Sequence, residues 1–128
     1  MPAMTQDNQV NVAVESNYVE AQSQPDMERF VFSYTITLTN QGNFPARLLS
    51  RHWVITDANE QVREVKDIGV VGKNPRINPG KSFTYSSHAV LETPHGMLQG
   101  SYEMLSDNGD SFVATIPDFN VSVPSHLH

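Results

Sequence analysis

A short glycine-bearing stretch in the middle of the chain carries the residue types best suited to binding an anion. Gly69 and Gly72 are followed by Lys73 and Arg76, and backbone amides beside basic side chains are a common setting for a phosphate group. The wider stretch 63–81 holds five basic residues against two acidic ones, a local balance of +3 in a chain of net charge −6. This polarity predicts contact with an anion or an acidic partner, and it is equally typical of a solvated loop rim.

The spacing of the glycines departs from a dinucleotide-binding fingerprint. That motif needs three glycines between a strand and a helix, whose first N–H groups hold the pyrophosphate. Asp67 occupies the place of the first glycine, and Pro75 and Pro79 exclude a following helix. We therefore expect the two remaining glycines to form a turn or bulge between strands, where loop amides and the two basic side chains would hold an anion only loosely.

The five histidines are scattered along the chain and predict no metal site. They are His52, His88, His95, His126 and His128. None belongs to a His-Glu-x-x-His pattern, and the last two lie on a tail where they could bind a divalent ion only weakly. The acidic run 107–110 resembles the start of a calcium loop, but Gly109 comes too early and the run is typical of a hairpin turn. We expect no metal and no cofactor.

Catalytic residues are not predicted either. Ser86, Ser87 and His88 are adjacent in a predicted strand, where neighbouring side chains point to opposite faces, so Ser87 and His88 cannot form a nucleophile–base pair. The chain has no Gly-x-Ser-x-Gly elbow, and the absence of cysteine removes thiol chemistry. The residue types therefore predict a protein that is not an enzyme.

Alternating apolar and polar residues place these candidates on β-strands and turns. The clearest strand is 30–40, in which aromatic and aliphatic side chains fill one face and mainly threonines fill the other. Further strands or extended segments are predicted at 10–14, 47–56, 61–65, 82–91, 99–105, 111–116 and 119–123. Between them, 40–45, 57–60, 77–80 and 107–110 have the composition of turns.

Three local expectations follow from this pattern. In the strand 47–56 we expect Leu49, Trp53 and Ile55 on one face and Leu48 and Val54 on the other, with Trp53 as the core anchor. Proline cannot donate to a strand ladder, so residue 117 is expected to end the strand that precedes it. The stretch 63–81 is expected to be a loop that connects two halves of the fold.

The fold class predicted from these strands is all-β. No window of ten or more residues has a helical period. Seven or eight short antiparallel strands with a tryptophan on the third are typical of a fibronectin type III or immunoglobulin-like β-sandwich, and a small closed barrel is the alternative. A length of 128 residues predicts one domain over 1–128, with about 10–124 ordered and the ends frayed.

Composition narrows the class of protein further. The acidic excess argues against binding of duplex nucleic acid, which needs basic residues to neutralise phosphates. No apolar run approaches the ~20 residues that span a bilayer, and the first residues lack the pattern of a secretion signal. A chain without cysteine fits a reducing compartment, so we expect a cytoplasmic protein. Unpaired sheet edges can meet across a two-fold axis, which leaves both a monomer and a homodimer open.

Six segments of the chain resemble the bacterial ApaG family. They are 29–40, 49–57, Gly69-Val-Val-Gly72, Ile77-Asn-Pro-Gly80, 83–87 and 92–104. The likeness runs in register from about Val10 to Pro124 and so covers almost the whole chain. The resemblance implies a fibronectin type III-like β-sandwich, which agrees with the pattern of the strands.

The resemblance also implies a kind of role. Similar proteins are described as cobalt and magnesium efflux-associated and are often encoded beside a diadenosine tetraphosphate hydrolase. Related eukaryotic domains sit within F-box proteins and a polymerase-delta-interacting protein, where they look like partner-binding modules. Family members commonly carry Gly-x-Gly-x-x-Gly at the central loop, which suggests nucleotide or pyrophosphate binding. This chain keeps only Gly69 and Gly72 of that pattern.

We therefore expect a non-enzymatic, cytoplasmic binding module that affects cobalt and magnesium tolerance indirectly, through a protein partner. The expected contact is the loop that bears Gly69, Gly72, Lys73 and Arg76. Two alternatives stay open: binding of a nucleotide, pyrophosphate or polyphosphate at the same loop, and direct weak binding of a divalent cation.

Overall fold

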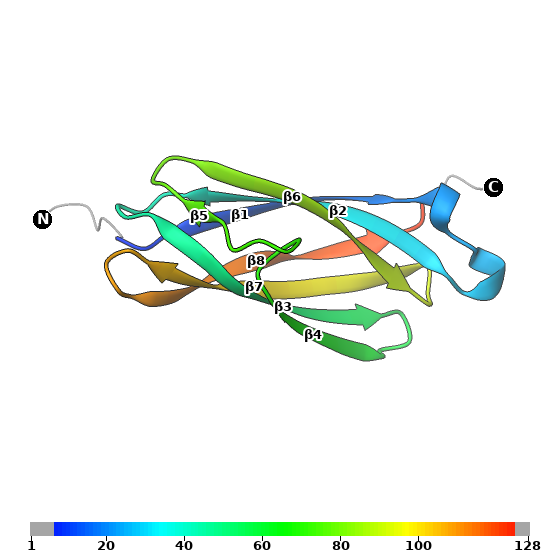
Figure 1. The fold of residues 1–128 in the computed structure, drawn as a ribbon. Helices are drawn as coiled ribbons and strands as arrows, with labels where there is room; N and C mark the ends of the chain where they lie inside the picture. The colour runs from blue at the N-terminus through cyan, green and yellow to red at the C-terminus, as the bar shows by residue number, and fades with distance from the viewer. Residues whose placement is uncertain (1–6, 125–128) are drawn as a thin grey trace, which may run out of the picture.

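The computed structural model describes residues 7–124 as a sandwich of two antiparallel sheets (Figure 1). The smaller sheet has the order β1-β2-β6, formed by Val10–Tyr18, Phe30–Asn40 and Ser82–Leu91. The larger sheet has the order β4-β3-β7-β8, formed by Val62–Ile68, Ala46–Asp57, His95–Ser106 and Ser111–Ser122. The short strand β5, Arg76–Ile77, pairs with the start of β3, and two single-turn 3-10 helices, η1 (Glu20–Gln22) and η2 (Pro25–Met27), connect β1 to β2. Two separate sheets confirm the predicted sandwich.

β2 has the bounds predicted from its alternation and supplies much of the core. Phe32, Ile36 and Leu38 are buried against the larger sheet. The opposite face of β2 carries threonines whose hydroxyls pair with hydroxyls of β6. These pairs are Thr35–Ser86, Thr37–Thr84 and Thr39–Ser82, at 2.8, 3.1 and 2.7 Å. One face of the smaller sheet is therefore a polar ladder exposed to water, and the other is apolar.

The faces predicted for β3 are wrong at its beginning. Leu48 and Trp53 are both buried, although five positions separate them and simple alternation would place them on opposite faces. The register between β3 and β7 shifts between Leu48 and Ser50, so Leu49 is an extra residue that reverses the alternation. Trp53 is the core anchor, as expected, and it packs against Tyr34 and Phe119 with ring centroids 5.1 and 6.0 Å apart.

Pro117 does not end its strand, which corrects a second expectation. β8 runs on to Ser122, and two residues, Pro117 and Asp118, lie opposite the single residue Gln99 of β7. β8 is the edge strand of the larger sheet, so a missing N–H there need not remove a hydrogen bond of the ladder. The bulge and the edge position together accommodate the proline.

The stretch 63–81 is only partly a loop. Its first six residues belong to β4 and Arg76–Ile77 form β5, so the irregular part is confined to 69–75 and the turn 78–81. The sequence 62–68 shows no alternation of apolar and polar residues, because all seven residues of this edge strand are exposed and neither face needs to be apolar. A fully exposed strand reads in the sequence like a polar loop.

Two buried tyrosines join the sheets inside the core. Tyr85 of β6 and Tyr102 of β7 are 7% and 0% exposed, and their hydroxyl groups hydrogen-bond to each other. Burial raises the pKa of Tyr85 to about 12 and raises the pKa of Tyr102 further. Both rings therefore stay protonated in the folded protein at pH values at which an exposed tyrosine ionises.

These pKa shifts predict a loss of stability in alkaline solution. An unfolded tyrosine ionises near pH 10, so above that pH the unfolded state releases protons that the folded state keeps. The free energy of unfolding should then fall by about 1.4 kcal/mol per pH unit for each of the two tyrosines. Urea titrations between about pH 9 and about pH 12 measure the slope, and Tyr85→Phe should make it shallower. A stability that stays constant over this range contradicts the predicted shifts.

The helices within residues 7–124 are two single turns, and neither could span a bilayer.

Candidate functional site

Two adjoining cavities lie along one open side of the sandwich, between β6 and the strands β3 and β4. The outer cavity has a volume of about 390 Å³ and the inner one about 320 Å³. They share Ile55, Arg63 and Val90, so they adjoin at Arg63, and we call the two together the β4–β6 groove. The outer part is also lined by Asp57, Gln61, Val62, Leu91 and Glu92, and the inner part by Tyr34, Arg51, Trp53, Val65, Ser87, His88, Ala89 and Leu98. The opposite side of the sandwich is closed by packing of β1 against β8.

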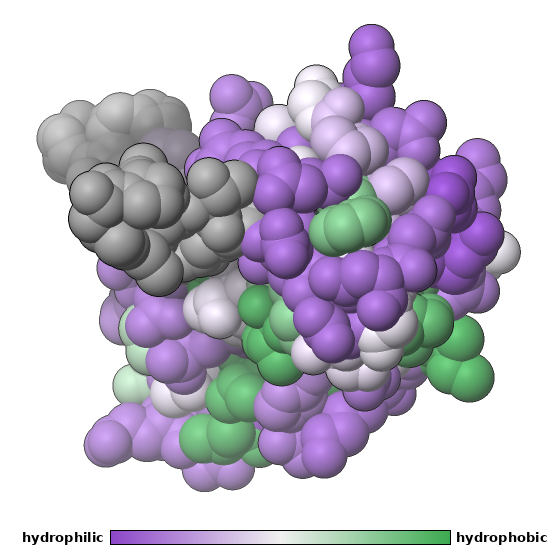
Figure 2. Space-filling view, turned by 90° about the vertical axis from the view of Figure 1, so that its left-hand side faces the viewer, coloured by the Kyte–Doolittle hydropathy of each residue, from purple (hydrophilic) through white to green (hydrophobic). Residues whose placement is uncertain are grey.

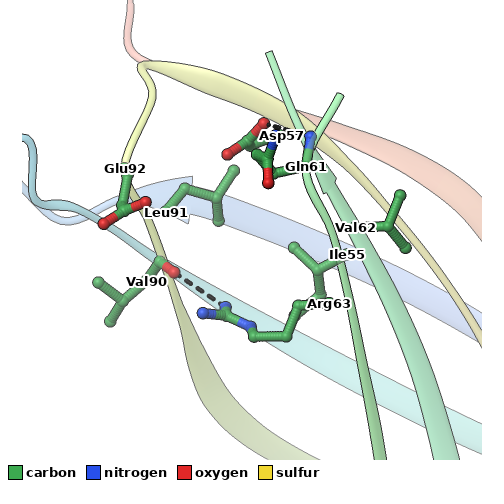
Figure 3. Close-up of a pocket in the computed structure, with 8 residues that line it drawn as sticks. All are labelled: Ile55, Asp57, Gln61, Val62, Arg63, Val90, Leu91 and Glu92. Atoms are coloured by element: carbon green, nitrogen blue, oxygen red, sulfur yellow. Dashed lines mark hydrogen bonds between the residues drawn. The ribbon is translucent and has the colours of Figure 1, made fainter. Parts of the chain in front are cut away.

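Arg63 crosses the groove and marks the boundary between its two parts. Its Nη2 donates a hydrogen bond of 3.0 Å to the main-chain carbonyl of Val90 on β6 (Figure 3). β6 is an edge strand, so part of its backbone faces this side of the molecule rather than a neighbouring strand. A long, flexible side chain on an exposed strand can withdraw at small cost, and withdrawal would join the two parts.

The inner part of the groove contains a buried donor without an acceptor. Trp53 is 3% exposed, and its Nε1 is one of the few buried side-chain atoms within residues 7–124 that have no hydrogen-bond partner. An ideal Cβ on Gly100 of β7 would lie 3.0 Å from Trp53 Cε3, so the benzene edge of the indole faces β7. Trp53 also lines the inner cavity, and its Nε1 is fully buried. A buried N–H in this position favours any ligand that brings an acceptor.

Arg51 neighbours the inner part and ties it to the central loop. Its Nη1 donates to the carbonyl of Gly69 at 2.6 Å, and its Nη2 pairs with Asp67 Oδ2 at 3.1 Å. Burial raises the pKa of the nearby Tyr34, which a hydrogen bond from Ser87 and the charge of Arg51 partly oppose. Because Asp67 already neutralises Arg51, the groove is suited to a ligand of mixed polarity better than to a concentrated negative charge.

The predicted loop is a tight turn between β4 and β5. Val70 and Lys73 exchange two backbone hydrogen bonds of 2.8 Å, and Val71 and Gly72 between them have φ values of 43° and 75°. Gly69 has a φ of 64°, and a Cβ there would lie 2.2 Å from the carbonyl oxygen of Lys73, so this position requires glycine. The expectation that the glycines form a turn between strands holds.

The two cations predicted for this loop are not brought together as an anion clamp. Lys73 is exposed at the turn. Arg76 lies on β5 and forms a salt bridge with Asp107, in the turn between β7 and β8, and this pairing lowers the pKa of Asp107. The Nε of Arg76 is also 3.3 Å from Asp107 Oδ1, so the guanidinium makes two contacts with the same carboxylate. Of the two side chains, only Lys73 extends freely from the turn.

The end of the sandwich that carries the β2–β3 and β7–β8 turns is a mainly hydrophilic surface. Figure 2 views the molecule from that end and shows a mostly hydrophilic surface with small groups of hydrophobic residues between the polar ones. The mixed apolar and charged lining of the β4–β6 groove distinguishes it from this surface. We therefore regard the groove, rather than the end turns, as the better candidate for a binding site.

The residues considered for metal binding and catalysis lie apart. No group of three or more histidine, aspartate or glutamate side chains within 7–124 is arranged to hold a metal ion, and His126 and His128 lie outside the described residues. His52 is instead engaged by Glu64, with 2.9 Å between Nε2 and Oε2. Ser87 lines the groove, whereas Ser86 hydrogen-bonds to Thr35 on the outer face of the smaller sheet.

The groove was not predicted from the sequence, because no pattern of neighbouring residues indicates it. Trp53 was identified only as a core anchor, and Arg63 only as one charge of a basic stretch. The position of Val90 opposite Arg63 depends on which strands are the edges of the two sheets, and no pattern within either segment carries that information.

Comparisons with known proteins give a consistent result. A family model described as the ApaG domain matches residues 20–106. The chain is 52% identical over 120 residues to a protein named Protein ApaG from Ectopseudomonas mendocina, an alignment that covers 94% of this chain and 95% of that one. It is 55% identical, with the same coverage, to Protein ApaG from Pseudomonas fluorescens. A crystal structure of an ApaA protein from Bordetella pertussis is 40% identical, covers 94% of this chain and 98% of that one, and superposes with a TM-score of 0.91.

Proposed function

The chain belongs to the ApaG domain family, and we propose that it is a non-enzymatic binding module that holds an extended segment of a protein partner in the β4–β6 groove. The observation that carries this proposal is the groove itself, two adjoining cavities along the edge of β6 that a single side chain, Arg63, separates. Any effect on cobalt or magnesium tolerance would then act through the partner.

An extended peptide matches the lining of the groove in three ways. The lining includes apolar side chains such as Ile55 and Val65, which would pack against apolar side chains of the peptide. Backbone of the edge strand β6 is available for pairing with another strand. Polar groups of the lining, such as the Ser87 hydroxyl and the Arg63 guanidinium, would hydrogen-bond to the backbone of the peptide.

The charges of the groove limit the kind of peptide that would fit. Arg63 lies between the two parts, while Asp57 and Glu92 line the outer part. A partner segment with an acidic residue near Arg63 and a basic residue near Glu92 would complement both. Electrostatic complementarity of this kind contributes mainly to specificity and to the rate of association.

Quantitative capture of a partner from a bacterial lysate tests the proposal. Arg63→Gln and Ser87→Glu change side chains on opposite walls of the groove, and we expect each to reduce retention about tenfold or more, as loss of a central interface contact does. Lys81→Gln and Thr84→Glu are the matched controls, since both residues are exposed and lie outside the groove. Equal retention by all four variants would exclude the groove as the binding surface.

A second candidate function is binding of a phosphate-bearing ligand at the turn 69–73. The specific observation in its favour is that Lys73 is exposed beside the N–H groups of Val71 and Gly72, which have no hydrogen-bond partner among the described residues. Calorimetry with ATP and with diadenosine tetraphosphate measures this binding directly, and Lys73→Glu should abolish the heat. Absence of heat at millimolar ligand would exclude phosphate binding at this turn and would leave the proposal of peptide binding in the groove unaffected.

A further inference from the structure

We propose that β4 is a self-complementary edge through which two copies of this chain pair across a two-fold axis centred on Val65. β4 is the last strand of the larger sheet, and all seven of its residues are exposed. An unpaired strand edge presents free N–H and C=O groups to any strand that approaches. This inference goes beyond the proposed function, and the two share Arg63, which lies on β4 and also lines the β4–β6 groove.

The hydrogen bonds at the two ends of β4 identify the backbone groups that face outwards. Asp57 N–H donates to the carbonyl of Gln61 at 3.0 Å, and Gly69 N–H donates to the carbonyl of Leu49 at 2.9 Å. Backbone groups alternate in direction along an antiparallel strand, so the odd-numbered residues of β4 bond to β3. The N–H and C=O groups of Val62, Glu64, Lys66 and Ile68 therefore face the free edge. Of these, the Ile68 N–H donates to Asp67 Oδ1 of its own chain at 2.8 Å and must leave it to pair with a second copy.

A two-fold axis at Val65 gives a register that satisfies both backbone and side chains. Glu64 lies opposite Lys66 of the second copy, and Val62 lies opposite Ile68, so the outward-facing backbone groups meet as hydrogen-bonded pairs. Arg63 lies opposite Asp67 of the second copy in a pair without backbone hydrogen bonds, where side chains approach most closely. Every charged residue of β4 then faces an opposite charge. The two most exposed apolar residues of the strand, Ile68 at 76% and Val62 at 65%, cover each other.

Neighbouring two-fold registers lose this complementarity. An axis at Arg63, Glu64, Lys66 or Asp67 places that charged residue directly opposite its own copy, which is destabilising across a strand pair. Axes at Val62 and Ile68 also place an uncharged residue on the axis, but they lie at the ends of the strand and pair few of its residues, whereas the axis at Val65 is central. The order of charges and the length of the strand together select a single register.

The charged side chains of β4 retain capacity for a second partner. Glu64 already pairs with His52, and Asp67 with Arg51, but the Glu64 and Asp67 side chains are 56% and 60% exposed. A carboxylate accepts several hydrogen bonds, so the contacts within one chain and those between two chains are compatible. Lys66 needs no rearrangement, because it is already exposed on the strand.

The opposite edge of the same sheet shows what a protected edge looks like in this protein. β8 contains Pro117 and a bulge opposite Gln99, two devices that prevent pairing with another strand. β4 has neither within Val62–Ile68. The four charged residues of β4 also discourage pairing with an arbitrary strand, but two copies of β4 in this register meet opposite charges.

Charge-swapped variants of the full chain test the proposal. Glu64→Lys and Lys66→Glu each place two like-charged pairs in a homodimer and should weaken self-association about tenfold or more. Mixing these two variants should restore it, because positions 64 and 66 are then both lysine in one chain and both glutamate in the other.

The controls and readouts are matched to this design. Glu15→Lys and Lys81→Glu make the same charge changes on exposed positions outside β4 and should associate as the unmodified chain does. Sedimentation equilibrium up to millimolar protein gives the mass of each sample, and association should weaken from about 10 mM to about 150 mM salt as screening increases. Amide exchange at Glu64 and Lys66 should slow as the dimer forms.

Each outcome decides the proposal. A chain that stays monomeric at millimolar concentration overturns it. A dimer that survives both single substitutions lies at another surface, and a mixture that stays monomeric while the unmodified chain associates excludes the Val65 register. The double variant Glu64→Lys with Lys66→Glu keeps the complementarity and should associate by itself.

Discussion

Replacement of Trp53 with alanine is expected to lower the free energy of unfolding by about 3–5 kcal/mol, the usual range for truncating a large buried aromatic side chain. Trp53 is 3% exposed and contacts Tyr34 of the opposite sheet and Phe119 of β8. Its loss would leave a cavity between the two sheets that rigid neighbouring strands cannot fill. Such a loss is a large part of the stability of a domain of this size.

Urea unfolding followed by circular dichroism measures the effect of Trp53→Ala, because this is the single tryptophan of the chain and its fluorescence disappears with it. Trp53→Phe is the matched control. It keeps an aromatic ring and removes the unpaired Nε1, so we expect a loss of less than half as much. A change below about 1 kcal/mol in the alanine variant would mean that Trp53 does not anchor the core.

Replacement of Asn40 with alanine is expected to cost about 3 kcal/mol, because it leaves several buried backbone groups without partners. Asn40 ends β2 and is 1% exposed. Its Nδ2 donates to the carbonyls of Phe44 and Ile77 at 2.9 and 2.8 Å, and its Oδ1 accepts from Gly42 N–H at 2.8 Å. The side chain thus joins the smaller sheet to β5 of the larger one and fixes the turn into β3.

Asn43→Ala provides the control for Asn40, since Asn43 lies in the same turn but is exposed. We expect its substitution to change stability by less than about 0.5 kcal/mol. The same urea titration compares the two variants. Equal effects would show that the buried hydrogen bonds of Asn40 contribute no more than a surface contact.

Strands with an apolar face were predictable from the sequence, and the exceptions have physical causes. The bounds of β2 follow from unbroken alternation over 30–40, which exists because one face is buried and the other wet. The faces of β3 were not predictable, since Leu48 and Leu49 are alike and only pairing with β7 decides which residue bulges. β4 escaped detection beyond residue 65 because neither of its faces is buried.

Only the parts of the candidate site that depend on residues close together in the sequence were predictable. Gly69 and Gly72 adopt left-handed conformations at a turn, as glycines between strands often do. The engagement of Arg76 by Asp107 joins residues that are 31 positions apart, and the pattern around Arg76 does not reveal it. The β4–β6 groove depends in the same way on the order of strands in both sheets. Contacts between residues that are far apart in the sequence could therefore be identified only from the folded structure.

The most direct test of the proposed binding groove is an amide-resonance map of the nitrogen-15-labelled chain, recorded before and after addition of a partner purified by the capture experiment. We predict that the resonances that shift most belong to residues on both walls of the groove, including Arg63 and Val90, together with the indole N–H of Trp53. Shifts confined to the turn 69–73, with the Trp53 indole unchanged, would contradict the groove and assign binding to the loop.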